Sequence, residues 1–228
     1  MAAHEHTCFV ETLGMGQSDI DTWDLTSGTP NEETYADYDA LLVGGSGQFS
    51  VLDPDPFIKD FLDFLADVVV DRKVPTFASC FGFQGLVLAG GGVVITDKDN
   101  AEVGTFDITL SAEGARDPLL APLAPGFRAQ LGHKDRADSL PAGMTCLARS
   151  ERAPIQALRV DDTAIFATQF HPELDREANT ARYLRYWEEY GTGDASDDPV
   201  LRSMRDTPEA SALLPRWVEQ ELVPNLRR

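Results

Sequence analysis

Cys80 stands between an apolar run and a glycine, in the stretch FASCFGFQG that spans residues 77–85. A strand-to-helix turn that exposes a nucleophile needs small residues two positions before and two positions after it, and Ala78 and Gly82 meet that need. The helix that follows would direct the positive end of its dipole at the sulfur and favour the thiolate. Taken alone, the same pattern also fits a buried structural cysteine. Cys80 is therefore a candidate nucleophile in need of a base.

His171 is the candidate for that base, in the stretch FATQFHPEL at residues 166–174. A strand-like run leads to the histidine, Pro172 restricts the backbone after it, and Glu173 follows. A thiol nucleophile needs a base, and the base needs an acid that orients its ring. By itself, the H-P-E sequence is more typical of a histidine and a glutamate that lie on the surface where a strand ends.

A third stretch, LLVGGSGQ at residues 41–48, has glycines directly after an apolar run. Glycines in such a place allow a backbone turn whose N–H groups point into a cleft, where they stabilise the oxyanion that forms when sulfur attacks a carbonyl. The signal is weak alone, because glycines after strands commonly form turns. All three stretches follow predicted strands, however, and the ends of parallel strands meet at one edge of a sheet.

The elements that must position these residues alternate between strand and helix patterns, which favours an α/β sheet with covered faces. Apolar strand patterns occupy residues 38–45 and 74–79, with a shorter one, DTWDL, at 21–25. Phenylalanines and leucines at helical spacing predict a helix over residues 55–71. Asp55 is its expected cap and Pro56 suits its first position.

Strand patterns dominate the second half of the chain, and helical patterns follow from Asp175 onward. The sequence predicts one domain at residues 1–190 and a C-terminal helical extension at 191–228 that packs on it, with 191–199 as the most flexible stretch.

Cys146 is expected to be an inert core residue, because it alternates with Met144 and Ala148 as on one strand face. The predicted strands lie at residues 91–97, 104–110, 145–150, 155–160 and 163–170.

The beginning of the chain departs from the usual order of such a sheet. It opens in the helix-like stretch HEHTCFVETLG, residues 4–14, with no strand pattern before it. A doubly wound domain normally begins with a central strand, so the usual first strand is absent from the pattern.

The composition of the chain disfavours several classes of binding partner and indicates a cellular compartment. The net charge of −19 over 228 residues disfavours nucleic acid and anionic membranes as partners. No apolar run approaches the roughly 18 residues of a membrane span, and the N-terminus lacks a signal-peptide pattern. The cysteines, Cys8, Cys80 and Cys146, are odd in number and lack metal-ligand spacing, which predicts a reducing cytoplasm without disulfides.

The ordered stretches LLVGGSG, SCFGFQG and QFHPE resemble the class I, or triad-type, glutamine amidotransferases. Two more, at residues 131–143 and 147–160, resemble the glutaminase domain of GMP synthetase and its stand-alone relatives. The resemblance implies a flavodoxin-like, doubly wound, mostly parallel sheet with helices on both faces. It implies Cys80 as nucleophile, His171 as base, Glu173 as its orienting partner, and the backbone of Gly45 and Phe81 as the oxyanion hole. The substrate-binding residues that it implies are Gln84, Gly132, His133, Lys134 and Asp135.

Two departures from the family pattern concern the turn itself. Ala78 stands where the family usually has glycine, and Phe83 where it usually has histidine or another residue. Alanine is nearly as small as glycine, and position 83 is not catalytic, so we expect neither to affect the chemistry.

The resemblance implies hydrolysis of the γ-amide of glutamine through a cysteinyl thioester, with no cofactor and no metal, and a possible ammonia-accepting synthetase partner. A γ-glutamyl peptidase would use the same three residues. A catalytically idle binding protein of the same fold is a further alternative, which the intact triad disfavours. A related superfamily of cysteine peptidases and chaperones also carries a cysteine on such a turn but lacks the H-P-E element.

Overall fold

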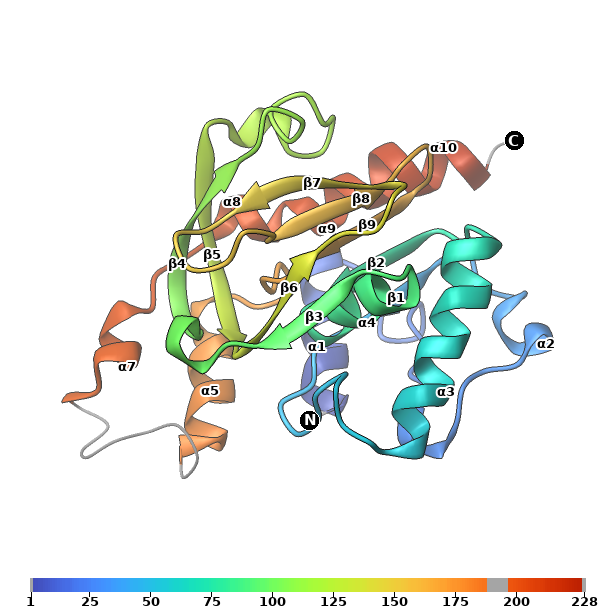
Figure 1. Cartoon of the computed structure of the whole chain (residues 1–228), viewed down its shortest axis with the longest axis horizontal. Helices are drawn as coiled ribbons and strands as arrows, with labels where there is room; N and C mark the ends of the chain where they lie inside the picture. Colours follow the sequence, from blue (N-terminus) through green and yellow to red (C-terminus); the bar gives the residue numbers. More distant parts are fainter. Residues whose placement is uncertain (1, 188–196, 227–228) are drawn as a thin grey trace.

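The computed structural model describes residues 2–187 and 197–226 (Figure 1). Its main sheet has seven strands in the order β1-β2-β9-β8-β7-β4-β5, and β3 pairs with β6 in a separate two-stranded sheet. The strands of the main sheet are β1 (Leu41–Val43), β2 (Thr76–Ser79), β4 (Glu102–Leu110), β5 (Gly126–His133), β7 (Met144–Arg149), β8 (Ala157–Val160) and β9 (Ile165–Thr168). The smaller sheet consists of β3 (Val93–Thr96) and β6 (Asp135–Ser139).

The α/β class is confirmed, and the sheet is mixed. Strands β1, β2 and β9 are parallel to one another, and these are the strands that precede the three candidate stretches. From β9 onward the neighbours β8, β7, β4 and β5 pair in antiparallel fashion. The parallel region is thus smaller than the sequence predicts, and it coincides with the candidate site.

Along the chain, helices lie before, between and after these strands. The helix predicted over residues 55–71 is present as α3 (Pro56–Phe64), continued by the π-helical segment η2 (Leu65–Asp71). Asp55 is its N-cap residue, but its side chain makes no capping hydrogen bond. The other helices are α1 (Ala2–Leu13), α2 (Glu32–Tyr35), α4 (Phe81–Ala89), α5 (Arg176–Arg185), α7 (Pro199–Ser203), α8 (Pro208–Ser211), α9 (Leu213–Trp217), η6 (Val218–Leu222) and α10 (Val223–Leu226).

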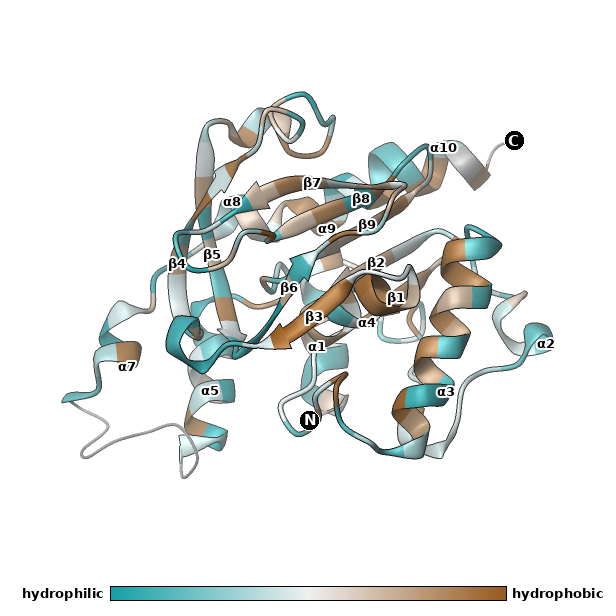
Figure 2. Ribbon diagram, in the orientation of Figure 1, coloured by the Kyte–Doolittle hydropathy of each residue, from teal (hydrophilic) through white to brown (hydrophobic). Residues whose placement is uncertain are grey.

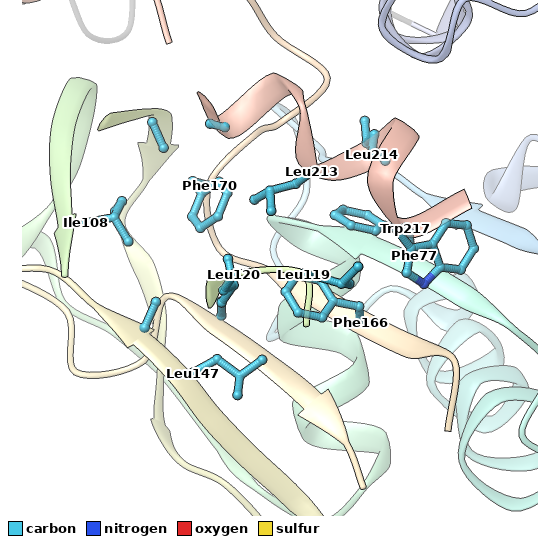
Figure 3. Close-up of a cluster of buried hydrophobic side chains, with 14 of the residues drawn as sticks. Phe77, Ile108, Leu119, Leu120, Leu147, Phe166, Phe170, Leu213, Leu214 and Trp217 are labelled. Carbon is cyan, nitrogen blue, oxygen red and sulfur yellow. The ribbon is translucent and has the colours of Figure 1, made fainter. Parts of the chain in front are cut away.

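Helices cover both faces of the parallel strands, as expected. Along β9, Phe166 belongs to one buried cluster with Phe77 of β2 and Trp217 of α9, whose side chains lie close together in Figure 3. The neighbouring Ala167 belongs to a second cluster with Phe61 of α3 and residues of α4. Successive strand residues point to opposite faces, so the two clusters lie on opposite sides of the sheet. In Figure 2, α3 accordingly carries both hydrophobic and hydrophilic residues.

The segment after residue 197 packs on the same core as the rest of the chain. Leu213, Leu214 and Trp217 of α9 are buried in the first cluster, and the Trp217 indole N–H donates to the Ala164 carbonyl oxygen at 3.1 Å. Most of the stretch 191–199, for which the sequence predicts flexibility, lies outside the described residues. Helix α9 therefore packs against the main sheet, and the division into a domain and an extension stays a prediction.

The first strand in the described part of the chain is β1, and α1 comes before it, in agreement with the missing first strand of the sequence pattern. The strand predicted at residues 21–25 is wrong. Asp24 instead caps the short 3-10 helix Leu25–Ser27 by accepting a hydrogen bond from the Thr26 N–H at 3.0 Å. An aspartate side chain that bonds its own backbone in this way competes with strand pairing.

In the antiparallel region, the sequence misses one strand, and the expected burial of Cys146 is wrong. The sequence pattern does not predict β5, because β5 buries the polar residues Gln130 and His133 where hydropathy predicts surface. In β7, a register irregularity between Cys146 and Ala148 breaks the expected alternation. Ala148 therefore joins the first cluster, whereas Cys146 is only partly buried against the edge of the second. Cys146 is not a core residue.

Candidate active site

Cys80 lies on a strained turn between β2 and α4. Its backbone has φ of 49° and ψ of −99°, a positive φ that residues other than glycine rarely adopt. The Cys80 N–H donates to the Thr168 carbonyl oxygen of β9 at 2.8 Å. A Cβ on Gly82 would lie 2.5 Å from the Val43 carbonyl oxygen, so only glycine fits there. The tight turn that the sequence predicts is therefore present, and it holds the sulfur at the end of a central strand.

His171 and Glu173 form a buried pair beside Cys80. His171 Nδ1 lies 2.5 Å from Glu173 Oε1, and their side chains are 2% and 0% exposed. The His171 backbone N–H is fixed by the Gln130 carbonyl oxygen of β5 at 2.9 Å. The imidazole and the Cys80 side chain both adjoin Gly45, since a Cβ at that position would lie 2.6 Å from His171 Cε1 and 3.5 Å from the Cys80 Cβ. The three residues that the sequence analysis groups from separate motifs thus lie together, in the order thiol, imidazole, carboxylate.

The electrostatics of the pair follow from its burial. Burial opposes charge on the ring, but the Glu173 carboxylate and Cys80 outweigh it and raise the pKa of His171 to about 9. Burial likewise opposes charge on Glu173, yet the imidazolium, its hydrogen bond and Arg182 hold the pKa of Glu173 below its usual range. The pair is therefore an imidazolium and a carboxylate near neutral pH, which is the form able to protonate a leaving group.

Gln169 reaches the sulfur from the other side, a contact that the sequence analysis does not predict. Its Nε2 donates to Cys80 Sγ at 3.7 Å, and its Oε1 accepts from Gln84 Nε2 at 3.1 Å. Gln84 Nε2 also donates to the Asp135 carbonyl oxygen at 2.7 Å. Gln84 therefore uses its amide hydrogens inside the protein, where they orient Gln169. The signal for Gln169 in the sequence is its place two residues before His171.

A pocket of about 250 Å³ opens over these residues. Cys80, Phe81, Gln84 and His171 line it on the sheet side. Helix α5 contributes cationic and aromatic groups that the sequence analysis does not single out. Arg182 is the closest of these to the triad: its side chain is 11% exposed and its Nη1 lies 3.5 Å from His171 Nδ1. The remaining lining residues are 46–50, Asp53, Ala101, Val103, 132–135, Asn179, Tyr183 and Tyr186.

The segment 132–135, to which the resemblance assigns substrate binding, runs from the end of β5 to the start of β6 and lines the pocket. Gly132 and Lys134 are exposed, whereas the side chains of His133 and Asp135 are engaged within the protein. His133 Nε2 lies 3.1 Å from Glu102 Oε2, and the Asp135 carboxylate accepts from two hydroxyl groups at 2.6 Å each. These side chains fix the segment at the edge of the pocket.

The two expected oxyanion donors differ in their surroundings. Phe81 begins α4, where a helix has no internal acceptor for its N–H, and it lines the pocket. Gly45 adjoins the triad, since a Cβ on it would lie 3.5 Å from the Cys80 Cβ. Its N–H, however, donates to Glu5 Oε1 of α1 at 2.7 Å. The sequence analysis does not predict Glu5 at this site.

The described residues contain neither a cluster of metal-ligating side chains nor a membrane-spanning helix. In the ranges 2–187 and 197–226, no group of three or more histidine, cysteine, aspartate or glutamate side chains could hold a metal ion. Among the same residues, every helix is too short or too polar to cross a membrane.

Known proteins resemble this chain in sequence. The family model for class-I glutamine amidotransferases matches residues 16–187. The chain is 34% identical over 142 residues to the glutamine-hydrolysing GMP synthase subunit of Sulfurisphaera tokodaii, which is 62% of this chain and 71% of that protein. It is 31% identical over 136 residues to the GMP synthase of Thermosipho africanus, which is 59% of this chain but 24% of that protein. The chain thus spans about a quarter of the length of the Thermosipho relative.

Solved structures share the fold at lower sequence identity. A glutamine amidotransferase from Thermotoga maritima matches with a TM-score of 0.72 and 22% identity over 89% of this chain and 86% of that one. A glutamine amidotransferase from Methylobacillus flagellatus matches with a TM-score of 0.71 and 22% identity over 98% of this chain and 88% of that one. Since the family model covers most of the chain, the protein belongs to the class I glutamine amidotransferase family.

Proposed function

We propose that the protein hydrolyses the γ-amide of glutamine to glutamate and ammonia, with Cys80 as nucleophile, His171 as general base and acid, and Glu173 as the group that orients His171. The observation that carries the proposal is the strained Cys80 turn beside the buried His171–Glu173 pair, at the wall of one pocket. A strained backbone at a cleft, next to a base with its own orienting acid, is the arrangement that an activated thiol requires.

The reaction proceeds in two halves. In the reacting form the proton is already on His171, and the Cys80 thiolate beside this imidazolium attacks the γ-carbonyl carbon to form a tetrahedral oxyanion. As the C–N bond breaks, the imidazolium returns the proton to the leaving nitrogen, so that ammonia departs and a γ-glutamyl thioester remains. His171 then takes a proton from water and the hydroxide attacks the thioester. The product leaves as glutamic acid and gives its proton to solvent, which restores the Cys80 thiolate beside the imidazolium.

The neighbouring side chains support these steps. Glu173 keeps the proton of His171 on Nδ1 and stabilises the imidazolium between the two transfers. The Gln169 amide donates toward the sulfur and thereby favours its anionic form. The Phe81 N–H at the start of α4 is in position to bind the oxyanion.

The fate of the ammonia is proposed from the relatives. The match covers 74% and 71% of two relatives that are named as glutamine-hydrolysing GMP synthase subunits, which supports a glutamine-hydrolysing role for the matched region. We infer a partner synthetase that accepts the ammonia. The volume of about 250 Å³ favours a substrate of amino-acid size over a long peptide.

The decisive experiment compares two substrates across matched variants. Purified protein is assayed for ammonia release from glutamine and for hydrolysis of γ-glutamyl dipeptides, alongside Cys80→Ala and the control Cys146→Ala. Glutamine turnover that disappears only in Cys80→Ala supports the proposal. Preference for the dipeptides would make the protein a γ-glutamyl peptidase. No turnover of either substrate, with or without candidate synthetases, would favour an idle binding protein.

A further inference from the structure

The side chain of Glu5 contacts the backbone of the loop that follows β1. Glu5 Oε1 accepts a hydrogen bond from the Gly45 N–H at 2.7 Å, although the two residues are far apart in the sequence. A Cβ on Gly44 would lie 2.5 Å from the Glu5 carboxyl carbon, so the absence of a side chain at position 44 makes room for this carboxylate. The contact is therefore built into both elements, α1 and the loop.

The orientation of the Gly44–Gly45 peptide follows from its two hydrogen bonds. The Gly44 carbonyl oxygen accepts from the Gly82 N–H of the nucleophile turn at 3.2 Å. In a trans peptide the C=O and N–H groups point in opposite directions, so the Gly45 N–H points away from this turn and toward α1. Consistent with this, Cys80 lines the pocket, whereas Glu5 and Gly45 are not among its described lining residues.

The carboxylate is held in place by charge and burial. Its side chain is 22% exposed, and Arg182 Nη2 lies 3.9 Å from Glu5 Oε1. Burial raises the pKa of Glu5, while Arg182 and the Gly45 N–H oppose the rise. A hydrogen bond between a backbone N–H and a carboxylate is stronger than one between neutral groups. The Gly45 N–H is thus already bonded to the Glu5 carboxyl group before any substrate binds.

We propose that Glu5 is a positioning residue that holds the Gly45 N–H away from Cys80, so that this donor reaches the oxyanion only after it leaves Glu5. The inference rests on the proposed function, because the oxyanion is that of the Cys80 reaction. Rotation of the Gly44–Gly45 peptide exchanges the carboxylate of Glu5 for the oxyanion as acceptor, and glycine tolerates the backbone angles that such a rotation requires. Glu5 therefore acts against the reaction in the free protein and sets how easily the oxyanion hole forms.

The test uses Glu5→Ala and Glu5→Gln, with Glu11→Ala as the control. Glu11 is an exposed glutamate on the same helix. The probe is glutarate semialdehyde, which lacks the α-amino group of glutamine and so cannot close to a cyclic imine; its carbonyl carbon would add to Cys80 and leave its oxygen in the oxyanion hole. Loss of a charge-assisted hydrogen bond of about 1.5–3 kcal/mol corresponds to roughly 10- to 100-fold tighter binding of the aldehyde by Glu5→Ala. Glu5→Gln, which keeps a neutral acceptor, is expected to show a smaller gain, and Glu11→Ala none.

A second readout does not depend on catalysis. In ¹⁵N-labelled protein, the Gly45 amide proton should move upfield and exchange faster with solvent in Glu5→Ala but not in Glu11→Ala. If wild type and Glu5 variants alike show neither turnover nor a Cys80 adduct, the proposed function itself fails. If wild type is active but Glu5→Ala and Glu5→Gln bind the aldehyde equally or more weakly, Glu5 builds the site rather than restraining it, and the positioning role proposed for Glu5 is overturned. Should Glu5→Ala not fold, Glu5→Gln decides by the same criteria.

Discussion

The Cys80 N–H donates to the carbonyl oxygen of Thr168 at 2.8 Å, which joins the turn that carries Cys80 to the strand that leads to His171. The bond continues the parallel pairing of β2 and β9, in which Ser79 lies opposite Thr168. The two strands are covered on both faces by buried clusters that contain Phe77 and Ala78 on β2. The relative position of thiol and imidazole is therefore a property of the sheet itself and not of mobile loops.

Glu173→Gln should lower glutamine turnover less than Cys80→Ala and should move the alkaline limit of activity. The Glu173 carboxylate raises the pKa of His171, so its loss brings the deprotonation of the imidazolium down from about 9, by roughly 1–3 pH units. The corresponding change in a serine triad costs about 10⁴-fold, which is an upper guide for a thiol. The check is a pH profile of kcat/KM for both proteins. An unchanged alkaline limb would contradict the assignment of Glu173.

The stability of the pair depends on pH in a window set by the same shifts. A histidine with a raised pKa adds stability that is complete below its ordinary value of 6.5 and is lost as the pH rises through about 9. Glu173, with a lowered pKa, adds stability that is complete above 4.5 and is lost in acid. Urea unfolding should therefore show the largest difference between wild type and Glu173→Gln at pH 4.5–6.5. A difference that grows toward pH 9 would refute this sign.

Cys80 should react before the other two cysteines, although it is as buried as Cys8 and more buried than Cys146. Burial raises the pKa of Cys8 to about 12 and also raises that of Cys146, so both are protonated at neutral pH. Cys80 is only 5% exposed but lines the pocket beside His171. We expect 6-diazo-5-oxo-norleucine to label Cys80 alone, as measured by peptide mass spectrometry, with Cys146→Ala labelled as fast as wild type. Preferential labelling of Cys146 would count against the proposed nucleophile.

The residues of the proposed triad could be found from the sequence because each lies in a short local pattern. A tight turn needs small residues at 78 and 82, and a base with its orienting acid fits the H-P-E spacing. Glu5 and Arg182 could not be found in this way. Their contacts with Gly45 and His171 arise from how α1 and α5 pack against the sheet, and no local spacing encodes that packing.

The strands also divide into those that a local sequence pattern predicts and one that depends on tertiary contacts. Apolar runs identify β1, β2 and β9, because strands buried on both faces are apolar throughout. Strand β5 escapes such a pattern, since Gln130 is fully buried yet bonded to Arg205, Asn179 and Thr105. Whether a buried polar side chain finds hydrogen-bond partners depends on residues that are distant in the sequence.

Gly82→Ala should destabilise the protein and slow the reaction. The added Cβ would meet the Val43 carbonyl oxygen at 2.5 Å, a backbone atom that cannot move without shifting β1 away from the turn. Overpacking of this kind costs about 1–3 kcal/mol. Gly132→Ala is the matched control for stability, because a Cβ there meets no atom within 4 Å. Thermal unfolding of the two variants measures the difference, and equal melting temperatures would show that the turn is looser than described.

Gln169→Leu should lower the rate of the reaction at Cys80 without changing the overall fold. The substitution removes the amide that donates to Cys80 Sγ at 3.7 Å and leaves Gln84 Nε2 with the Asp135 carbonyl oxygen as its remaining acceptor. Because a hydrogen bond to an anion contributes about 1.5–3 kcal/mol and sulfur is a weak acceptor, we expect the lower end, about a tenfold loss of kcat/KM. Gln169→Glu should lose more, since a carboxylate beside the sulfur disfavours the thiolate.

A structural role for Gln169 is separated from a chemical one by the rate of Cys80 alkylation. Iodoacetamide reacts with the thiolate and needs no glutamine pocket, so its rate reports the state of the sulfur directly. If Gln169 stabilises the thiolate, the pH profile of alkylation shifts to higher pH in Gln169→Leu and further in Gln169→Glu. If Gln169 only supports Gln84 and the segment 132–135, the alkylation profile stays in place and KM for glutamine rises instead. The second result would remove Gln169 from the chemistry and assign it to substrate binding.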